Sequence, residues 1–331
     1  QRAAWVDDPM AWRARTRAVE DRLSDALHDR LSQRFVDRRA VVVLGPTAVQ
    51  PEVSAEGVVT AAGQPMGHLH GFSFLPAAGL GQASQVRRAL LAMLADELTD
   101  RVQRCVEAPH ESFEIDDQGR ILWDGAHLAR LTRGRGPLEP TLRLVRLDLI
   151  GTGACARIER RLRAWVQDLL QQLFESIREP VELRAGGRGL LFQLEQGLGT
   201  VDRRAAQPQL QALGRGEKRT LGRLGVRIGS RFVYAADLLE PRHIAVRSVL
   251  AGLAHVRGSL PAPPPSGAST TVADRKVSPD LYTSIGYPVV GGLGVRVDLL
   301  EKLMSRTHAL GRSGKRFELP QEALEWLGCG P

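Results

Sequence analysis

Two stretches of fifteen residues decide the fold, because the second repeats the first. Residues 57–71 read GVVTAAGQPMGHLHG, and residues 119–133 read GRILWDGAHLARLTR. At an offset of 62 positions, both fit the pattern G-x-[VI]-x-x-x-G-x-x-[ML]-[GA]-x-L. The first glycine is typical of a tight turn into a strand, and the second of a hairpin turn that needs a positive φ. We therefore predict the same β-hairpin in both places.

An amphipathic helix is predicted after each hairpin. Apolar side chains recur every three or four positions in residues 82–107 and again in residues 154–178. A proline follows each helix, at Pro109 and at Pro180. A unit of about 65–70 residues that occurs twice indicates a tandem duplication. The alternative is that two glycine-rich hairpins resemble each other by chance.

The rest of the chain completes an α+β fold. Residues 9–39 are predicted as a helix whose apolar stripe needs a partner, and residues 184–189, RAGGRG, as a flexible basic loop. A polar helix is expected around 202–223, a strand at 226–234 and a helix at 241–256. The predicted parts are a helical segment (1–40), a first hairpin-helix repeat (41–110), a second repeat (111–180), a basic α/β segment (181–257), a Pro/Gly/Ser linker (258–280) and a small C-terminal unit (281–331), with helices near 279–285, 296–309 and 320–327.

The net charge of +8 is concentrated in one segment. Residues 1–180 contain 24 basic and 24 acidic residues, whereas residues 181–260 contain 13 basic and only 6 acidic residues. A local excess of this kind indicates a surface for a polyanion. The alternative is an ordinary solvated surface in an arginine-rich protein, since 41 of the 45 basic residues are arginine.

The basic segment therefore holds the candidate site. Arg184 and Arg188 flank two glycines, so that backbone amides and guanidinium groups together would meet a phosphate. Further basic residues recur at intervals of about four, and a tyrosine is expected to supply a stacking platform. The predicted nucleic-acid-binding residues are Arg184, Arg188, Lys218, Arg219, Arg223, Arg227, Arg231 and Tyr234.

The motifs for metal and nucleotide binding occur in this sequence only in incomplete form. His68 and His70 lie two residues apart, as two metal ligands on a strand would, but the second copy has Arg130 and Thr132 there, so we predict no metal site. RSGKR at 312–316 lacks the first glycine and the final Ser or Thr of a phosphate-binding loop, and GGLGVRVD at 291–298 is a lone glycine-rich turn. We predict no catalytic residue in this chain. A helix-turn-helix in residues 281–331 and an independent hydrolase are weaker alternatives.

The composition and the cysteine pattern indicate in which cellular compartment the protein lies. The 43% hydrophobic content is ordinary for a soluble protein, no apolar run approaches the length of a membrane span, and the three cysteines have no CxxC spacing. We therefore expect a cytoplasmic protein without a membrane partner. The first residue is Gln1, and we expect the chain to be a piece of a longer polypeptide.

The N-terminal run WVDDPMAWRARTRAVEDRLSDALHDRLSQRFVDRR (5–39) resembles a segment of bacterial superfamily-2 DExH-type helicases related to the mitochondrial degradosome RNA helicase. There it follows the second RecA-like domain. Three later stretches fit the same C-terminal region: DQGRILWDGAHLARL (117–131), LGVRIGSRFVYAADLLEP (224–241) and VSPDLYTSIGYPVVGGLGVRVDLLEKL (277–303).

This resemblance implies that the chain is the non-motor accessory region of an ATP-dependent helicase. Residues 1–40 would pack on the upstream motor, which would hold ATP and Mg²⁺, so that this chain itself carries no cofactor. The implied function is to bind single-stranded nucleic acid, RNA more than DNA, and to guide it to or from the motor. The alternative function is a protein-interaction platform that docks the helicase to a nuclease or another partner.

Overall fold

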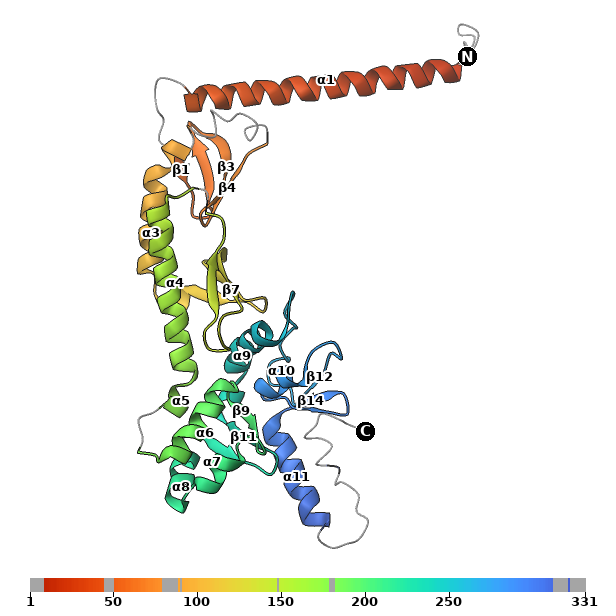
Figure 1. Cartoon of the computed structure of the whole chain (residues 1–331). Coiled ribbons are helices and arrows are strands. Elements are labelled where there is room, and N and C mark those ends of the chain that lie inside the picture. Colours follow the sequence, from red (N-terminus) through yellow and green to blue (C-terminus); the bar gives the residue numbers. More distant parts are fainter. Residues whose placement is uncertain are drawn as a thin grey trace. The chain divides into compact units, whose positions relative to one another are not determined.

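The structure is a computed structural model that describes residues 9–44, 51–78, 89, 91–147, 149–178, 182–311 and 321. Helices alternate with small antiparallel sheets, of which the described residues form four (Figure 1), so the predicted α+β class is confirmed. The chain divides into two compact units. The first comprises residues 1–108 and 146–155, and the second comprises residues 109–145 and 156–331.

The first unit begins with a single long helix, α1 (Pro9–Leu44), which extends past the predicted end at residue 39. Its apolar stripe is exposed, with Trp12 at 56% and Leu23 at 70% of full accessibility. No helix in the described part of the chain is both long enough and apolar enough to cross a membrane.

Each predicted hairpin is the centre of a four-stranded antiparallel meander. The first sheet consists of β1 (Glu52–Val53), β2 (Val58–Ala61), β3 (Gln64–His70) and β4 (Ser73–Pro76) in that order. The second consists of β5 (Phe113–Ile115), β6 (Arg120–Trp123), β7 (Ala126–Thr132) and β8 (Thr141–Leu144), again in order. The outer strands are two to four residues long, too short to show a period in the sequence.

The two sheets agree in backbone detail at the offset of 62. Gly57 and Gly119 have φ of 86° and 72°, and Gly63 and Gly125 have φ of 70° and 75°. A side chain at Gly57 would place Cβ only 2.3 Å from the carbonyl oxygen of Leu69, so glycine is required there. The register of both central hairpins also shifts at the same place, between Val59 and Thr60 and between Ile121 and Leu122.

The two sheets differ in one connection. Residues 71–72 join β3 to β4, whereas residues 133–140 join β7 to β8. The chain regains its register beyond these loops, because the N–H of Ala77 donates to the carbonyl of Met66 (2.8 Å) and that of Val145 to Leu128 (2.9 Å). The second sheet therefore carries an insertion of about six residues at this loop.

A helix follows each sheet, as predicted. Helix α3 (Ala95–Glu107) buries Leu98, Val102 and Cys105, and the Arg101 guanidinium donates to the carbonyl of Gly71. Helix α4 (Thr152–Leu173) packs on the second sheet, where the Trp165 indole lies against Phe113 with ring centroids 5.6 Å apart. The predicted helix 154–178 is interrupted at Phe174, after which the short α5 (Glu175–Arg178) begins. Residues 82–88 of the other predicted helix lie outside the described residues.

The expected basic loop at 184–189 is wrong, because these residues form the first turn of helix α6 (Ala185–Gln196). A Cβ at Gly186 would lie 2.9 Å from the Cβ of Ala212 in α7 (Gln207–Ala212). The glycines therefore allow two helices to approach closely rather than providing flexibility. Helix α8 (Arg215–Arg223) and a three-stranded sheet of β9 (Thr200–Asp202), β10 (Val226–Ile228) and β11 (Phe232–Ala235) complete this part.

The linker expected at 258–280 is also wrong in part, because it contains strand β12 (Thr270–Val272). This strand pairs with β14 (Leu293–Val295), which also pairs with β13 (Val289–Val290). The Tyr287 hydroxyl donates to the carbonyl of Ala268 at 2.6 Å. The partners lie about twenty residues away in sequence, so composition alone does not reveal the strand.

The remaining elements are η1 (His110–Ser112), η2 (Asp237–Leu239), α9 (Pro241–His255), α10 (Pro279–Ser284) and α11 (Val297–Gly311). The predicted helix at 320–327 lies outside the described residues except for residue 321.

Helix α11 is attached to the β10–β11 turn by one buried carboxylate. Glu301 is 6% exposed and accepts the backbone N–H groups of Ser230 (2.6 Å), Arg231 (2.8 Å) and Phe232 (2.7 Å), and the Ser230 hydroxyl (2.8 Å). Bonds of this kind to an ionised acceptor are stronger than neutral ones.

Glu301→Gln is therefore expected to lower the free energy of unfolding by about 2–3 kcal/mol, because the amide offers one acceptor oxygen where the carboxylate offers two. Amide hydrogen exchange at Ser230, Arg231 and Phe232 should become faster. The matched control is Arg306→Gln, an exposed position on the same helix. Equal exchange rates in Glu301→Gln and in the unchanged protein would contradict this role.

Candidate functional site

The eight predicted residues lie in the second unit, and the seven basic ones among them are all exposed. Glu217 links two of their elements, because its carboxylate accepts the N–H of Gly214 at 3.1 Å and that of Arg184 at 3.0 Å. These bonds, that from Gly214 first, lower the pKa of Glu217. Arg184 precedes α6, Arg188 lies in α6, Lys218, Arg219 and Arg223 lie in α8, Arg227 lies in β10, Arg231 lies in the β10–β11 turn, and Tyr234 lies in β11.

Only part of this set gathers on one surface. Arg219 and Arg223 are four residues apart on α8 and share a face. The Arg227 guanidinium donates to the carbonyl of Gly222, which places it beside the end of the same helix. The strand predicted at 226–234 is in fact two strands, β10 and β11, and Arg231 lies in the turn between them, so it does not share a strand face with Arg227.

Tyr234 does not provide the expected stacking platform. Its side chain is 8% exposed and packs with Phe232, Val295, Val297 and Leu300. Burial raises the pKa of its hydroxyl. In a four-residue strand that is buried throughout, the ring has no face left for a base.

A second basic surface lies on the sheet of the second repeat, in a part of the chain that has no excess of basic over acidic residues. Arg120 on β6 is the register partner of Arg130 on β7, and Arg130 is the register partner of Arg143 on β8. All three are exposed. Residues that pair directly share a face of the sheet with Cβ atoms about 5 Å apart. Three guanidinium groups therefore form a row across three strands, which we call the arginine row.

The arginine row contributes little to the fold: Arg130 Nε donates to the carbonyl of Gln118 at 3.3 Å, and Arg120 pairs with Asp116. Like charges directly opposite each other on a sheet are destabilising, by up to about 1 kcal/mol a pair. Asp116 balances one end, since its carboxylate pairs with Arg120. Burial raises the pKa of Asp116, but hydrogen bonds from Arg120 and Gln118 outweigh it and the pKa is lowered. Within the described residues, Arg130 and Arg143 have no carboxylate within ion-pairing distance. Such a row is typical of a surface that receives an anion.

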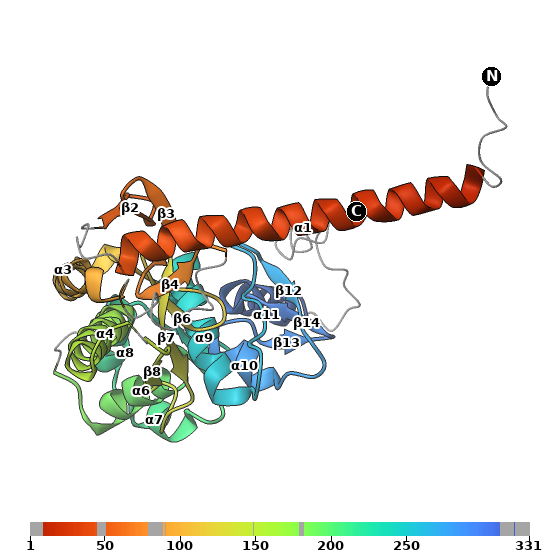
Figure 2. The same ribbon diagram turned by 90° about the horizontal axis from the view of Figure 1, so that it is seen from above.

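Strand β7 and helix α9 lie near one another in both ribbon views (Figures 1 and 2). Residues from both line a groove of about 880 Å³ that adjoins the row. Arg130, Arg133 and Arg257 contribute positive charge, and Leu253 and Val256 of α9 and its C-terminal end contribute apolar surface. None of the described residues that line the groove is acidic. A smaller hollow of about 140 Å³ continues from it beneath the inserted loop and adds Arg135. Positive charge next to an aliphatic wall is a suitable binding surface for an anion that carries an apolar group.

Gln118 fixes the shape of this groove. Its amide donates to the carbonyl of Leu260 at 3.1 Å and accepts the N–H of Leu260 at 3.1 Å and the Ser259 hydroxyl at 2.9 Å. These bonds hold the segment after α9 to the β5–β6 turn. The groove is thus formed by residues that the sequence analysis divided among the second repeat, the end of the basic segment and the linker, which is why sequence reasoning missed it.

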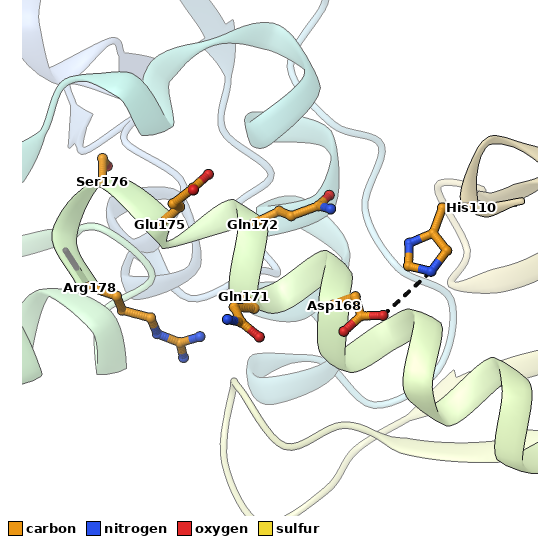
Figure 3. A pocket seen from close by; sticks show the side chains of 7 residues that line it. All are labelled: His110, Asp168, Gln171, Gln172, Glu175, Ser176 and Arg178. Atoms are coloured by element: carbon orange, nitrogen blue, oxygen red, sulfur yellow. Dashed lines mark ion pairs between the residues drawn. The ribbon is translucent and has the colours of Figure 1, made fainter. Parts of the chain in front are cut away.

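Figure 3 shows another groove, of about 1030 Å³, beside α4 and α5. His110 and Asp168 point toward one another across it, with Nε2 and Oδ2 3.4 Å apart. Among the described residues of its lining, Asp168 and Glu175 outweigh a single arginine, Arg178, so a polyanion is disfavoured here. Within the described part of the chain, no three His, Cys, Asp or Glu side chains converge as a metal ion would need.

The arginine row and its groove are therefore the strongest candidate site, with the α8 arginines second. Comparisons of the chain with protein-family models, with curated proteins and with solved structures found no match, so no relative suggests a ligand for either surface.

Proposed function

We propose that this chain binds single-stranded nucleic acid, RNA more than DNA, through the arginine row and the adjoining groove. The observation that carries the proposal is the direct pairing of Arg120 with Arg130 and of Arg130 with Arg143. Guanidinium groups bind phosphate through two parallel hydrogen bonds, so a row of them follows a phosphate backbone.

The aliphatic wall favours a single strand over a duplex. Leu253 and Val256 offer apolar surface next to Arg257, and guanidinium planes also stack on bases. In a duplex the base faces are stacked inside and only the phosphates would find a partner. In a single strand a base is free to contact the wall while its phosphate meets an arginine.

The arginines of α6, α8 and β10 form a second phosphate-binding surface in this proposal. They lie in the same unit as the arginine row, and Arg219, Arg223 and Arg227 lie close together. The exposure of these arginines is expected both of a phosphate-binding surface and of an ordinary solvated surface. Mutation of each of the two surfaces in turn shows which of them binds RNA.

The wider role rests on the resemblance to helicase C-terminal regions. In that setting the chain would guide a strand to or from an upstream RecA-like motor that binds ATP and Mg²⁺, and a nuclease is a possible partner. An ATPase assay of the motor-containing protein, with and without residues 41–331, tests the coupling. Equal RNA-stimulated rates in both forms would count against it.

Binding is expected to depend steeply on salt. If the three arginines of the row contact phosphates, the logarithm of the association constant should fall with the logarithm of salt concentration with a slope of about −2, and therefore by about 15-fold between 50 and 200 mM salt. Fluorescence anisotropy with a labelled 20-nucleotide RNA measures this slope. A peptide nucleic acid with the same bases is the control without backbone charge. The proposal fails if RNA does not bind at 50 mM salt or if the uncharged control binds as tightly.

A further inference from the structure

The first sheet carries a row at the same three backbone positions as the arginine row. Val58 is the register partner of His68, and His68 is the register partner of Leu75. At the offset of 62, and with the inserted loop taken into account, these positions correspond to Arg120, Arg130 and Arg143. The aliphatic side chains are exposed, Val58 at 38% and Leu75 at 74%.

The second sheet acts as an internal control for the first. The two share the glycine turns at Gly57/Gly119 and Gly63/Gly125 and the register shift of the central hairpin, and the second accepts three arginines at these positions. The backbone therefore does not demand apolar side chains there. An isolated exposed Leu is unremarkable, but two exposed aliphatic side chains on either side of the half-buried His68, where the twin sheet has three exposed arginines, indicate a different ligand.

The charge of the first sheet itself disfavours a polyanion and favours a cation. Residues 51–78 contain Glu52 and Glu56 and no Lys or Arg. Glu56 accepts the Ser54 hydroxyl at 2.8 Å, and this bond lowers its pKa, so it stays ionised at neutral pH. Glu52 lies on β1 of the same sheet. A ligand that complements this surface combines aliphatic groups with positive charge.

We propose that the Val58–His68–Leu75 face docks a protein segment that presents aliphatic side chains next to Lys or Arg. Leu75 lies on β4, the last strand of the sheet, where an extended segment has access to the row. The two copies of the duplicated unit would then bind different ligands, the first a protein and the second a nucleic acid.

The test exchanges the two rows. Val58→Arg/His68→Arg/Leu75→Arg gives the first sheet the residues that the second has at the same register positions. Three labelled peptides of twelve residues serve as probes, with alternating Leu and Lys, Leu and Glu, or Ser and Lys. We expect the unchanged chain to bind the Leu/Lys peptide at least 10-fold more tightly than the other two. The exchanged variant should bind it at least 10-fold more weakly.

Val58→Thr/Leu75→Thr keeps strand-favouring residues without added charge and should also lose peptide binding, with an unchanged circular dichroism spectrum. Equal binding of the Ser/Lys peptide, or peptide binding that survives both variants, would overturn the proposal. Loss of RNA binding in the threonine variant would overturn it too, by making this face a nucleic-acid surface. The proposed function is tested separately, because its measurement is RNA binding and its variants lie in the arginine row.

Discussion

Arg130→Thr/Arg143→Thr is expected to weaken the binding of single-stranded RNA about 100-fold at 100 mM salt. Each arginine is exposed in the row and would donate charge-assisted hydrogen bonds to a phosphate, each contact contributing about 1.5 kcal/mol. The salt slope should become shallower by about 1.4, since each lost phosphate contact removes about 0.7 for a single strand. Fluorescence anisotropy across a salt series measures both quantities.

The same variant should be about as stable as the unchanged protein, because the removal of like charges opposite each other offsets the loss of the bond from Arg130 to the carbonyl of Gln118. Urea unfolding checks this and separates lost binding from lost folding. Arg219→Ala/Arg223→Ala on α8 is the matched control and also the rival site. If that control weakens binding more than the row variant does, the sheet is not the principal surface.

Arg247→Met is expected to lower the free energy of unfolding by about 3–5 kcal/mol. Arg247 is fully buried in α9, and its guanidinium donates to the carbonyls of Leu238 and Ser284 and to the Thr200 hydroxyl. Burial lowers the pKa of Arg247 to about 9, so it stays charged at neutral pH. Methionine retains much of the volume but leaves three buried acceptors without a donor.

Urea unfolding monitored by circular dichroism measures the loss. Arg242→Met is the matched control, since Arg242 lies on the same helix with its side chain 76% exposed, and we expect a change within 0.5 kcal/mol. Arg247→Lys should rescue little, because an ammonium group cannot reach acceptors on three elements with the geometry of a planar guanidinium. A stability of Arg247→Met within 1 kcal/mol of the unchanged protein would contradict this account.

The features that could be predicted from the sequence are local ones. Gly57, Gly63 and their counterparts adopt positive φ because the turns allow little else, so the glycine pattern alone revealed the duplication. Long helices with an apolar stripe, such as α1 and α4, were also visible from their periodicity.

Predictions were less accurate for segments whose structural partners lie far away in the sequence. The glycines at 186–187 looked flexible in sequence but allow α6 to pack on α7, and the proline-rich segment at 258–280 gained a strand from partners at 293–295. Tyr234 looked available because its strand is next to basic residues, yet the neighbouring α11 helps to bury it.

The sequence by itself determined the duplicated unit, the α+β class and the presence of excess positive charge, because turns, helix periods and composition are properties of nearby residues. Only the tertiary structure decided where charge gathers. Arg120, Arg130 and Arg143 are ten or more residues apart in a region with no net charge, and strand register alone makes them neighbours. The same register places Val58, His68 and Leu75 in the equivalent row. Pairing across strands is a long-range property, so the two faces that distinguish the copies are visible only once the sheets are formed.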